Sequence, residues 1–124
     1  MKKVICTPKA PKAIGPYSQA IDANGTLYIS GQVPINPADG TVPDTIEAQT
    51  HQCFANIKAI LDEAGYGFDQ VVKSVVLLAD MNDFAAMNAV YAEYYTTDMP
   101  ARVCYQVAKL PMGVKIEIET TAVK

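Results

Sequence analysis

Two stretches near the end of the chain place a cation, a thiol and carboxylates at alternating positions. The first holds Arg102 and Cys104, and the second holds Glu117 and Glu119. An arginine fork can bind a small carboxylate through two parallel hydrogen bonds. A glutamate can act as a general base, and a cysteine thiolate can act as a nucleophile. The two stretches therefore contain a candidate anion-binding group, a candidate base and a candidate nucleophile.

Alternation of apolar and polar residues predicts that these stretches are two successive strands, separated by the turn signal Leu110-Pro111-Met112-Gly113. Side chains two residues apart share one face of a strand. On the first strand, one face carries Arg102, Cys104 and Gln106 and the other carries Val103, Tyr105 and Val107. On the second strand, one face carries Lys115, Glu117 and Glu119 and the other carries Ile116 and Ile118. Antiparallel strands often expose one polar face, where charged groups only add solubility. On the alternation alone, that structural explanation is favoured over a functional one.

A glycine inside a predicted strand gives a third signal. The dipeptide Asn24-Gly25 predicts a hairpin turn, and the strand after it, at 27–33, places Ser30 beside Gly31 with alternate residues on opposite faces. Glycine at such a position costs about 0.5–1 kcal/mol relative to alanine. It marks a bulge, tight packing, or the close approach of a ligand or another backbone. These explanations are equally compatible with the sequence.

Tyr17 is a further candidate because of the residues before it. Prolines within 8–16 fix the backbone and make this segment stiff and irregular, and Gly15 allows a conformation that other residues resist. A turn at Gly15-Pro16 could aim the Tyr17 ring at one place.

Two helices are expected between the strands. The first begins with Asp44 as N-cap and Glu47 as its capping-box partner, and ends at Gly65. Cys53 lies on the apolar stripe of this helix and is expected to be a packed core thiol, whereas His51 lies off it and is expected at the surface. The second helix is expected at about 83–96, where Asn88 lies beside the apolar stripe as a surface amide within reach of a site.

Length and composition predict a single domain over residues 1–124, since 124 residues with 50% hydrophobic content suffice for one core. No run of 18 apolar residues and no signal-peptide pattern is present, so we expect a cytoplasmic protein without a membrane span.

Three cysteines without a short spacing and a single histidine predict no metal site. The net charge of −3 predicts no general nucleic-acid binding.

The order of elements predicts an α+β fold with one mixed sheet and both helices on a single face. A strand at 71–79, the second helix and the strand at 101–108 form a right-handed crossover. The other face is expected to carry Ser30, Arg102, Cys104 and Glu117, and another copy of the chain is expected to bury it.

Four separated motifs in the same order resemble the Rid (YjgF) family of imine deaminases, and most of all its RidA branch. They are Gly15-Pro16-Tyr17-Ser18-Gln19, Ser30-Gly31-Gln32-Val33-Pro34, Pro100-Ala101-Arg102-Val103-Cys104, and Leu110-Pro111 with Ile116-Glu117-Ile118-Glu119. The resemblance covers the whole chain. It implies a chorismate-mutase-like fold, a homotrimer with active sites in clefts between subunits, and hydrolysis of 2-iminobutanoate and 2-iminopropanoate to 2-oxo acids and ammonia without a cofactor.

The resemblance also assigns roles to residues. It implies that Arg102 binds the substrate carboxylate, with backbone donors at Gly31 and near Cys104 completing the clamp. Glu117 would hold and deprotonate the attacking water, and Tyr17 and Ser30 would close the cleft and orient water or the imine nitrogen. Hydrolysis of an iminium needs no covalent intermediate, so the Cys104 thiol is not expected to be required.

Two features differ from the RidA pattern. The connection from Tyr95 to Pro100 is shorter, and Val103 and Tyr105 are bulkier, which affects the rim of the cleft and the packing around it. The alternative functions are a non-catalytic regulator that binds a 2-oxo acid or another small carboxylate, and a ribonuclease of the translation-inhibitor type. An acidic chain with one histidine disfavours a histidine-dependent ribonuclease.

Overall fold

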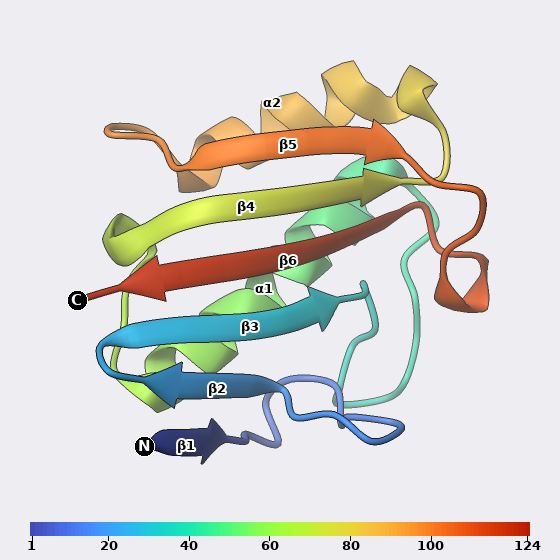
Figure 1. Ribbon diagram of the computed structural model, residues 1–124. Helices are drawn as coiled ribbons and strands as arrows, with labels where there is room; N and C mark the ends of the chain where they lie inside the picture. The colour runs from blue at the N-terminus through green and yellow to red at the C-terminus, as the bar shows by residue number, and fades with distance from the viewer.

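A six-stranded sheet with both helices behind it makes up the computed structural model, which describes residues 1–124 (Figure 1). The strands lie in the order β1-β2-β3-β6-β4-β5. The elements are β1 (Lys2–Ile5), β2 (Ala20–Ala23), β3 (Thr26–Gln32), α1 (Ile46–Ala64), β4 (Val71–Leu78), α2 (Phe84–Tyr94), β5 (Ala101–Gln106) and β6 (Ile116–Val123), with 3-10 turns at Phe68–Gln70, Met81–Asp83 and Pro111–Gly113. The predicted α+β fold with helices on one face is confirmed.

The predicted hairpin and crossover are both present. β2 and β3 pair antiparallel around Asn24 and Gly25, whose φ values of 53° and 81° are both positive, as the favoured two-residue hairpin turn requires. β4 and β5 pair in parallel, with α2 between them in the chain. β6 lies between β3 and β4 and is antiparallel to both, so the C-terminal strand is central and β5 is an edge strand.

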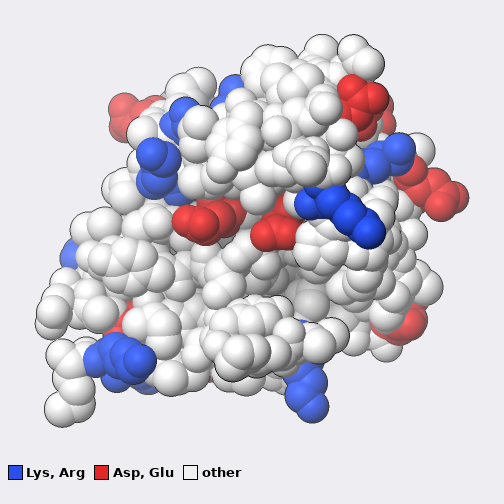
Figure 2. Space-filling view, turned by 45° about the vertical axis from the view of Figure 1, so that its right-hand side comes forward, with Lys and Arg blue, Asp and Glu red and all other residues white.

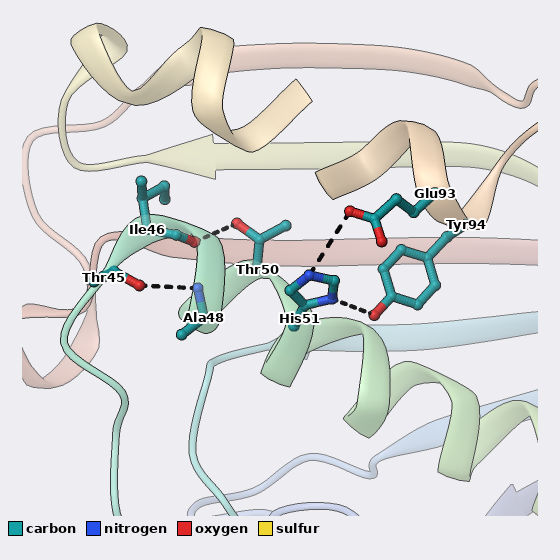
Figure 3. A network of polar contacts seen from close by, with 7 residues as sticks. All are labelled: Thr45, Ile46, Ala48, Thr50, His51, Glu93 and Tyr94. Carbon is teal, nitrogen blue, oxygen red and sulfur yellow. Dashed lines mark hydrogen bonds and ion pairs between the residues drawn. The ribbon is translucent and has the colours of Figure 1, made fainter. Parts of the chain in front are cut away.

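The boundaries of α1 correct one prediction. The N-cap is Thr45 and not Asp44, because the Thr45 hydroxyl accepts a hydrogen bond from the Ala48 N–H at 3.1 Å (Figure 3). Asp44 is one residue too early to reach that donor. Gly65 ends the helix as predicted, with a left-handed φ of 78°. The second helix is shorter than the predicted 83–96, because a 3-10 turn precedes it and Tyr95 is already extended.

The two helices pack against each other through contacts between aromatic rings. Phe54 of α1 stacks on Tyr94 of α2 with ring centroids 4.1 Å apart, and Tyr91 and Tyr95 meet the same ring edge-on. Such pairs add about 0.5–1.5 kcal/mol each beyond the area they bury. Cys53, next to Phe54, is fully buried, which confirms the prediction of a core thiol.

His51 is exposed, as predicted, but it has partners that the sequence did not indicate. Its Nδ1 lies 2.7 Å from the Tyr94 hydroxyl and its Nε2 lies 3.9 Å from a Glu93 carboxylate oxygen (Figure 3). The histidine therefore links α1 to α2 at the surface.

The sheet face opposite the helices is uncovered and partly apolar. Its exposed residues include Val4, Tyr28, Val103, Tyr105 and Val123. Val75 and Leu77 of β4 also lie on this uncovered face and are only half-buried. Neither helix combines the length and apolar character needed to cross a membrane.

Candidate active site

A bulge in β3 brings Ser30 and Gly31 to the uncovered face. The pairing of β3 with β6 passes from Ile29–Thr120 to Gln32–Ile118, so β3 has two residues where β6 has only Glu119. One extra residue changes the alternation beyond it. Gln32 is therefore buried under the helices, whereas the simple alternation grouped it with Ser30.

Glu117 lies directly against Gly31. A Cβ placed on Gly31 would lie 2.9 Å from the Glu117 carboxyl carbon, and its contact with a carboxylate oxygen would be closer still. Only glycine therefore leaves room for the carboxylate in this position. Of the explanations for a glycine within the strand, the structure shows a bulge and the close approach of a side chain from the neighbouring strand.

Four of the predicted site residues line one cleft of about 680 Å³, namely Tyr17, Ser30, Gly31 and Glu117. One wall comes from the stiff proline segment, through Pro11, Lys12 and Ile14, and another from Pro111 and Met112 in the turn before β6. Figure 2 shows acidic side chains beside a hollow on this side of the molecule. The volume suits a small metabolite.

The surroundings of Glu117 make its carboxylate a better proton acceptor. Burial raises the pKa of Glu117 above its ordinary value, and the negative charge of Glu119 raises it further. Glu117 is half-buried, whereas Glu119 is exposed. A carboxylate with a raised pKa is a stronger base than a solvated one, and it can also return the proton to a leaving group.

Two hydroxyls at the cleft have defined hydrogen-bonding roles. Ser30 Oγ donates to the Ser18 carbonyl at 2.6 Å, so its lone pairs stay free to accept. The Tyr17 hydroxyl accepts a hydrogen bond from the Ile14 N–H at 3.3 Å and keeps its own hydrogen to donate. The cleft therefore presents one acceptor hydroxyl, one donor hydroxyl and one carboxylate.

Buried polar side chains of α1, which the sequence pattern did not indicate, hold the segments that carry these groups. Asn56 donates to the carbonyls of Val33 and Ile35, both at 3.0 Å, just after the bulge. Gln49 accepts from the Lys115 N–H at 2.8 Å, just before Glu117. Both amides lie on the apolar side of α1, and a buried amide there needs a backbone partner.

Gln19 has the same role for the proline segment. Its amide accepts from the Thr7 N–H at 2.7 Å and donates to the carbonyls of Thr7 at 3.1 Å and Pro11 at 2.9 Å. Gln19 is 4% exposed, so its two bonds to Thr7 are shielded from water. The hydrogen bonds of Gln19 fix the wall of the cleft that contains Pro11, Lys12 and Ile14.

Arg102 and Cys104 lie elsewhere, which corrects the predicted grouping. In the register of β4 and β5, Arg102 pairs with Ser74 and Cys104 with Val76, and both of these partners are fully buried under the helices. Paired residues share a face. The two predicted residues therefore belong to the helix-covered face, because the pattern of a strand does not tell on which side the helices pack.

The environment of Cys104 is that of a neutral thiol. It is partly buried against the core, and this burial raises the pKa of Cys104, with the Arg102 charge acting in the opposite direction. No three or more His, Cys, Asp or Glu side chains gather closely enough to hold a metal ion.

Within one chain, Arg102 and Glu117 do not meet. Glu117 pairs with Leu77 on the uncovered face of β6, and β4 lies between β6 and β5. Arg102 is exposed at the edge strand and forms no ion pair, although it has a planar fork of five donors.

Comparison with known proteins connects this arrangement to a family. The family model described as "Endoribonuclease L-PSP" matches residues 7–124. A RutC family protein of Pyrococcus horikoshii is 56% identical, with 100% of this chain and 99% of that protein covered. A Mus musculus protein named 2-iminobutanoate/2-iminopropanoate deaminase is 50% identical, with 100% of this chain and 93% of that protein covered.

Solved structures agree with the fold over the whole chain. A conserved Rid family protein of Yersinia pestis has a TM-score of 0.97 at 45% identity, covering 100% of both chains. Escherichia coli TdcF with bound serine has a TM-score of 0.95 at 41% identity, covering 98% of both chains. The family model, the similar sequences and the similar structures agree. The chain therefore belongs to the Endoribonuclease L-PSP family, which is the Rid (YjgF) family that its sequence resembles.

Proposed function

We propose that this protein is a cofactor-free deaminase that hydrolyses 2-imino acids, such as 2-iminobutanoate and 2-iminopropanoate, to 2-oxo acids and ammonia. The observation that carries the proposal is the half-buried Glu117 carboxylate, with its raised pKa, held over Gly31 in a cleft of about 680 Å³. The mouse relative, half of whose aligned residues are identical, is named for this reaction. A cytoplasmic location stays a prediction.

The proposed chemistry adds water across a C=N bond. Glu117 takes a proton from water as its oxygen bonds to the iminium carbon, and the C=N pair moves onto nitrogen. The resulting amino alcohol then expels ammonia: Glu117 returns the proton to nitrogen, the C–N bond breaks, and the hydroxyl passes its own proton back to the Glu117 carboxylate as the C=O bond forms. Tyr17 can donate to the forming oxygen, and Ser30 can accept from water or from the imine N–H. General acid–base help of this kind is worth about 10²–10⁴-fold.

The substrate carboxylate needs a cation, and we assign this role to Arg102 of a neighbouring subunit in a homotrimer. Arg102 has no ion pair within its own chain and lies at an exposed edge, while the uncovered sheet face is partly apolar and suited to burial by other copies. TdcF was solved with serine, which carries a carboxylate and a nitrogen on the adjacent carbon, like an imino acid. Backbone donors at Gly31 and near Cys104 complete the proposed clamp.

Imine trapping tests the reaction itself. A threonine dehydratase reaction with semicarbazide present is run with and without the protein. The deaminase accelerates formation of 2-oxobutanoate and lowers the yield of semicarbazone. If both stay unchanged while calorimetry shows 2-oxobutanoate binding, the protein is a carboxylate-binding regulator instead.

Subunit mixing tests where the site lies. Arg102→Ala and Glu117→Gln are each expected to be inactive, and they are unfolded together and refolded as mixed trimers. A shared site takes its arginine from one subunit and its glutamate from the next, so random mixing restores about a quarter of the parent activity. Absence of any recovery would place both residues in one chain's site and reject the shared arrangement.

A second candidate function comes from the description of the matched family model as an endoribonuclease. The only histidine, His51, is held by Tyr94 and Glu93 outside the cleft, and the chain carries a net charge of −3. Incubation with single-stranded RNA decides this: cleavage abolished by Glu117→Gln would assign it to the same cleft, and no cleavage would exclude it.

A further inference from the structure

Three residues of α2 contact the Arg102 guanidinium. Asn88 Oδ1 accepts a hydrogen bond from Arg102 Nη1 at 2.7 Å. The guanidinium carbon lies 4.7 Å from the ring centroid of Tyr91 and 5.5 Å from that of Phe84. Phe84, Asn88 and Tyr91 are spaced by four and three residues, so they share one side of the helix.

This contact leaves most of the fork unused. Arg102 makes no other side-chain hydrogen bond and no ion pair. Nη1 is the nitrogen on the Cδ side of the guanidinium, so the Asn88 bond leaves the Nε–Nη2 edge open. That edge offers the two parallel donors that a carboxylate requires. Because arginine only donates, the acceptor of Asn88 must be its oxygen, which fixes the orientation of the amide.

We propose that Asn88 is a positioning residue that holds Arg102 so that the Nε–Nη2 edge receives the substrate carboxylate. This inference rests on the proposed function and adds how the clamp is oriented. The rings of Tyr91 and Phe84 support the guanidinium, and Asn88 sets its rotation. A flexible arginine would otherwise have to be ordered when the substrate binds, which weakens binding.

The neutral amide is essential to the idea. An aspartate at position 88 would keep the size and the hydrogen bond but would form an ion pair with Arg102. The bound carboxylate would then compete with a charge already in place. Alanine at position 88 would free the guanidinium without neutralising it. Asn88→Asp should therefore weaken carboxylate binding more than Asn88→Ala does, although it is the smaller structural change.

The test compares Asn88→Asp, Asn88→Ala and the control Asn82→Asp, which adds the same charge at an exposed position near the start of α2. Calorimetry with 2-oxobutanoate and the imine assay give Kd, KM and kcat. We expect Asn88→Ala to raise Kd and KM about ten- to a hundredfold, with kcat less affected. Asn88→Asp should bind more weakly still and recover binding as the pH falls and the aspartate is protonated. Asn82→Asp should match the parent.

The outcomes separate this inference from the proposed function. If the parent turns over the imine and both Asn88 variants bind 2-oxobutanoate like the parent, Asn88 has no positioning role. If the parent binds 2-oxobutanoate without turnover, the deaminase proposal fails while the order of binding among the variants still tests Asn88. A crystal structure in which 2-oxobutanoate binds Nη1 and displaces Asn88 would reject the proposal that the Nε–Nη2 edge binds the carboxylate.

Discussion

The carboxylate of Glu117 occupies the space that a side chain on Gly31 would need. The two residues come from different strands, and the bulge in β3 places them together on the uncovered face. The shape of the cleft therefore depends on the absence of a side chain at one position and on the presence of a carboxylate at another.

Replacing Gly31 by alanine should displace Glu117 and lower kcat/KM at least tenfold, because a shift of about 1 Å at the reacting groups can cost as much as 10²-fold. The control is Gly67→Ala. There a Cβ would lie 2.6 Å from Asp69 Oδ1, at a place outside the cleft. Steady-state kinetics and circular dichroism on both variants make the comparison. A fully active Gly31→Ala protein would show that Glu117 can act from another position.

The pH dependence of activity should follow Glu117. The pKa of Glu117 is raised by burial and then by the Glu119 charge, so the ionised base is lost as the pH falls through a value above that of an ordinary glutamate. Glu119→Gln removes the repulsion, lowers the pKa of Glu117 and should shift the acidic limb of the kcat/KM profile to lower pH. Glu63→Gln, on the exposed side of α1, is the control. An unshifted limb in Glu119→Gln would mean that another group sets it.

The contribution of Glu117 to the stability of the fold should depend on pH in the opposite direction to activity. A group whose pKa is raised on folding stabilises the protein below its unfolded-state pKa, and this contribution disappears as the pH rises through the folded-state pKa. Glu117 is such a group. The ionised, half-buried glutamate that the proposed chemistry needs therefore lowers the stability of the fold, a trade-off between activity and stability that is common at functional sites.

How far the sequence could predict the site depends on the kind of information required. The hairpin at Asn24-Gly25 and the end of α1 at Gly65 were predictable because they depend on local backbone conformation. The bulge at Gly31 was not, since alternation assumes one residue on each side of every pair. The face of Arg102 depends on which side α2 packs, which is a tertiary property.

The buried amides show a second limit. Gln49 and Asn56 of α1 bind backbone groups more than 20 residues away in the chain, at Lys115 and Val33. A periodic pattern reports that a position faces the core, but it does not identify a partner from another part of the chain. Amides on an apolar stripe were the available signal, since a buried amide requires a partner.

Cys104→Ser should keep most of the deaminase activity. The thiol is partly buried, and this burial raises the pKa of Cys104, so little thiolate exists at neutral pH. Its proposed contribution is a backbone donor, which serine retains. Mass spectrometry after incubation with the imine-generating reaction should find no adduct on the parent protein. Loss of activity in Cys104→Ser, or a covalent adduct at Cys104 of the parent protein, would contradict this.

The hydroxyl of Tyr95 is buried and makes no hydrogen bond, whereas that of Tyr91 lies close to the hydroxyl of Ser74. An unpaired buried polar group costs about 1–3 kcal/mol, so Tyr95→Phe should leave the free energy of unfolding unchanged or raise it. The control is Tyr66→Phe, because the Tyr66 hydroxyl donates to Asp22 Oδ1 at 3.1 Å.

Losing the Tyr66 bond should destabilise the protein by about 1 kcal/mol. Tyr95 and Tyr66 are both largely buried, at 4% and 5% exposure, so the two substitutions differ mainly in the partner of the hydroxyl. Urea unfolding monitored by circular dichroism gives the two free energies. If Tyr95→Phe destabilises the protein as much as Tyr66→Phe, the Tyr95 hydroxyl has a partner after all, and a buried water molecule is the group that could supply it.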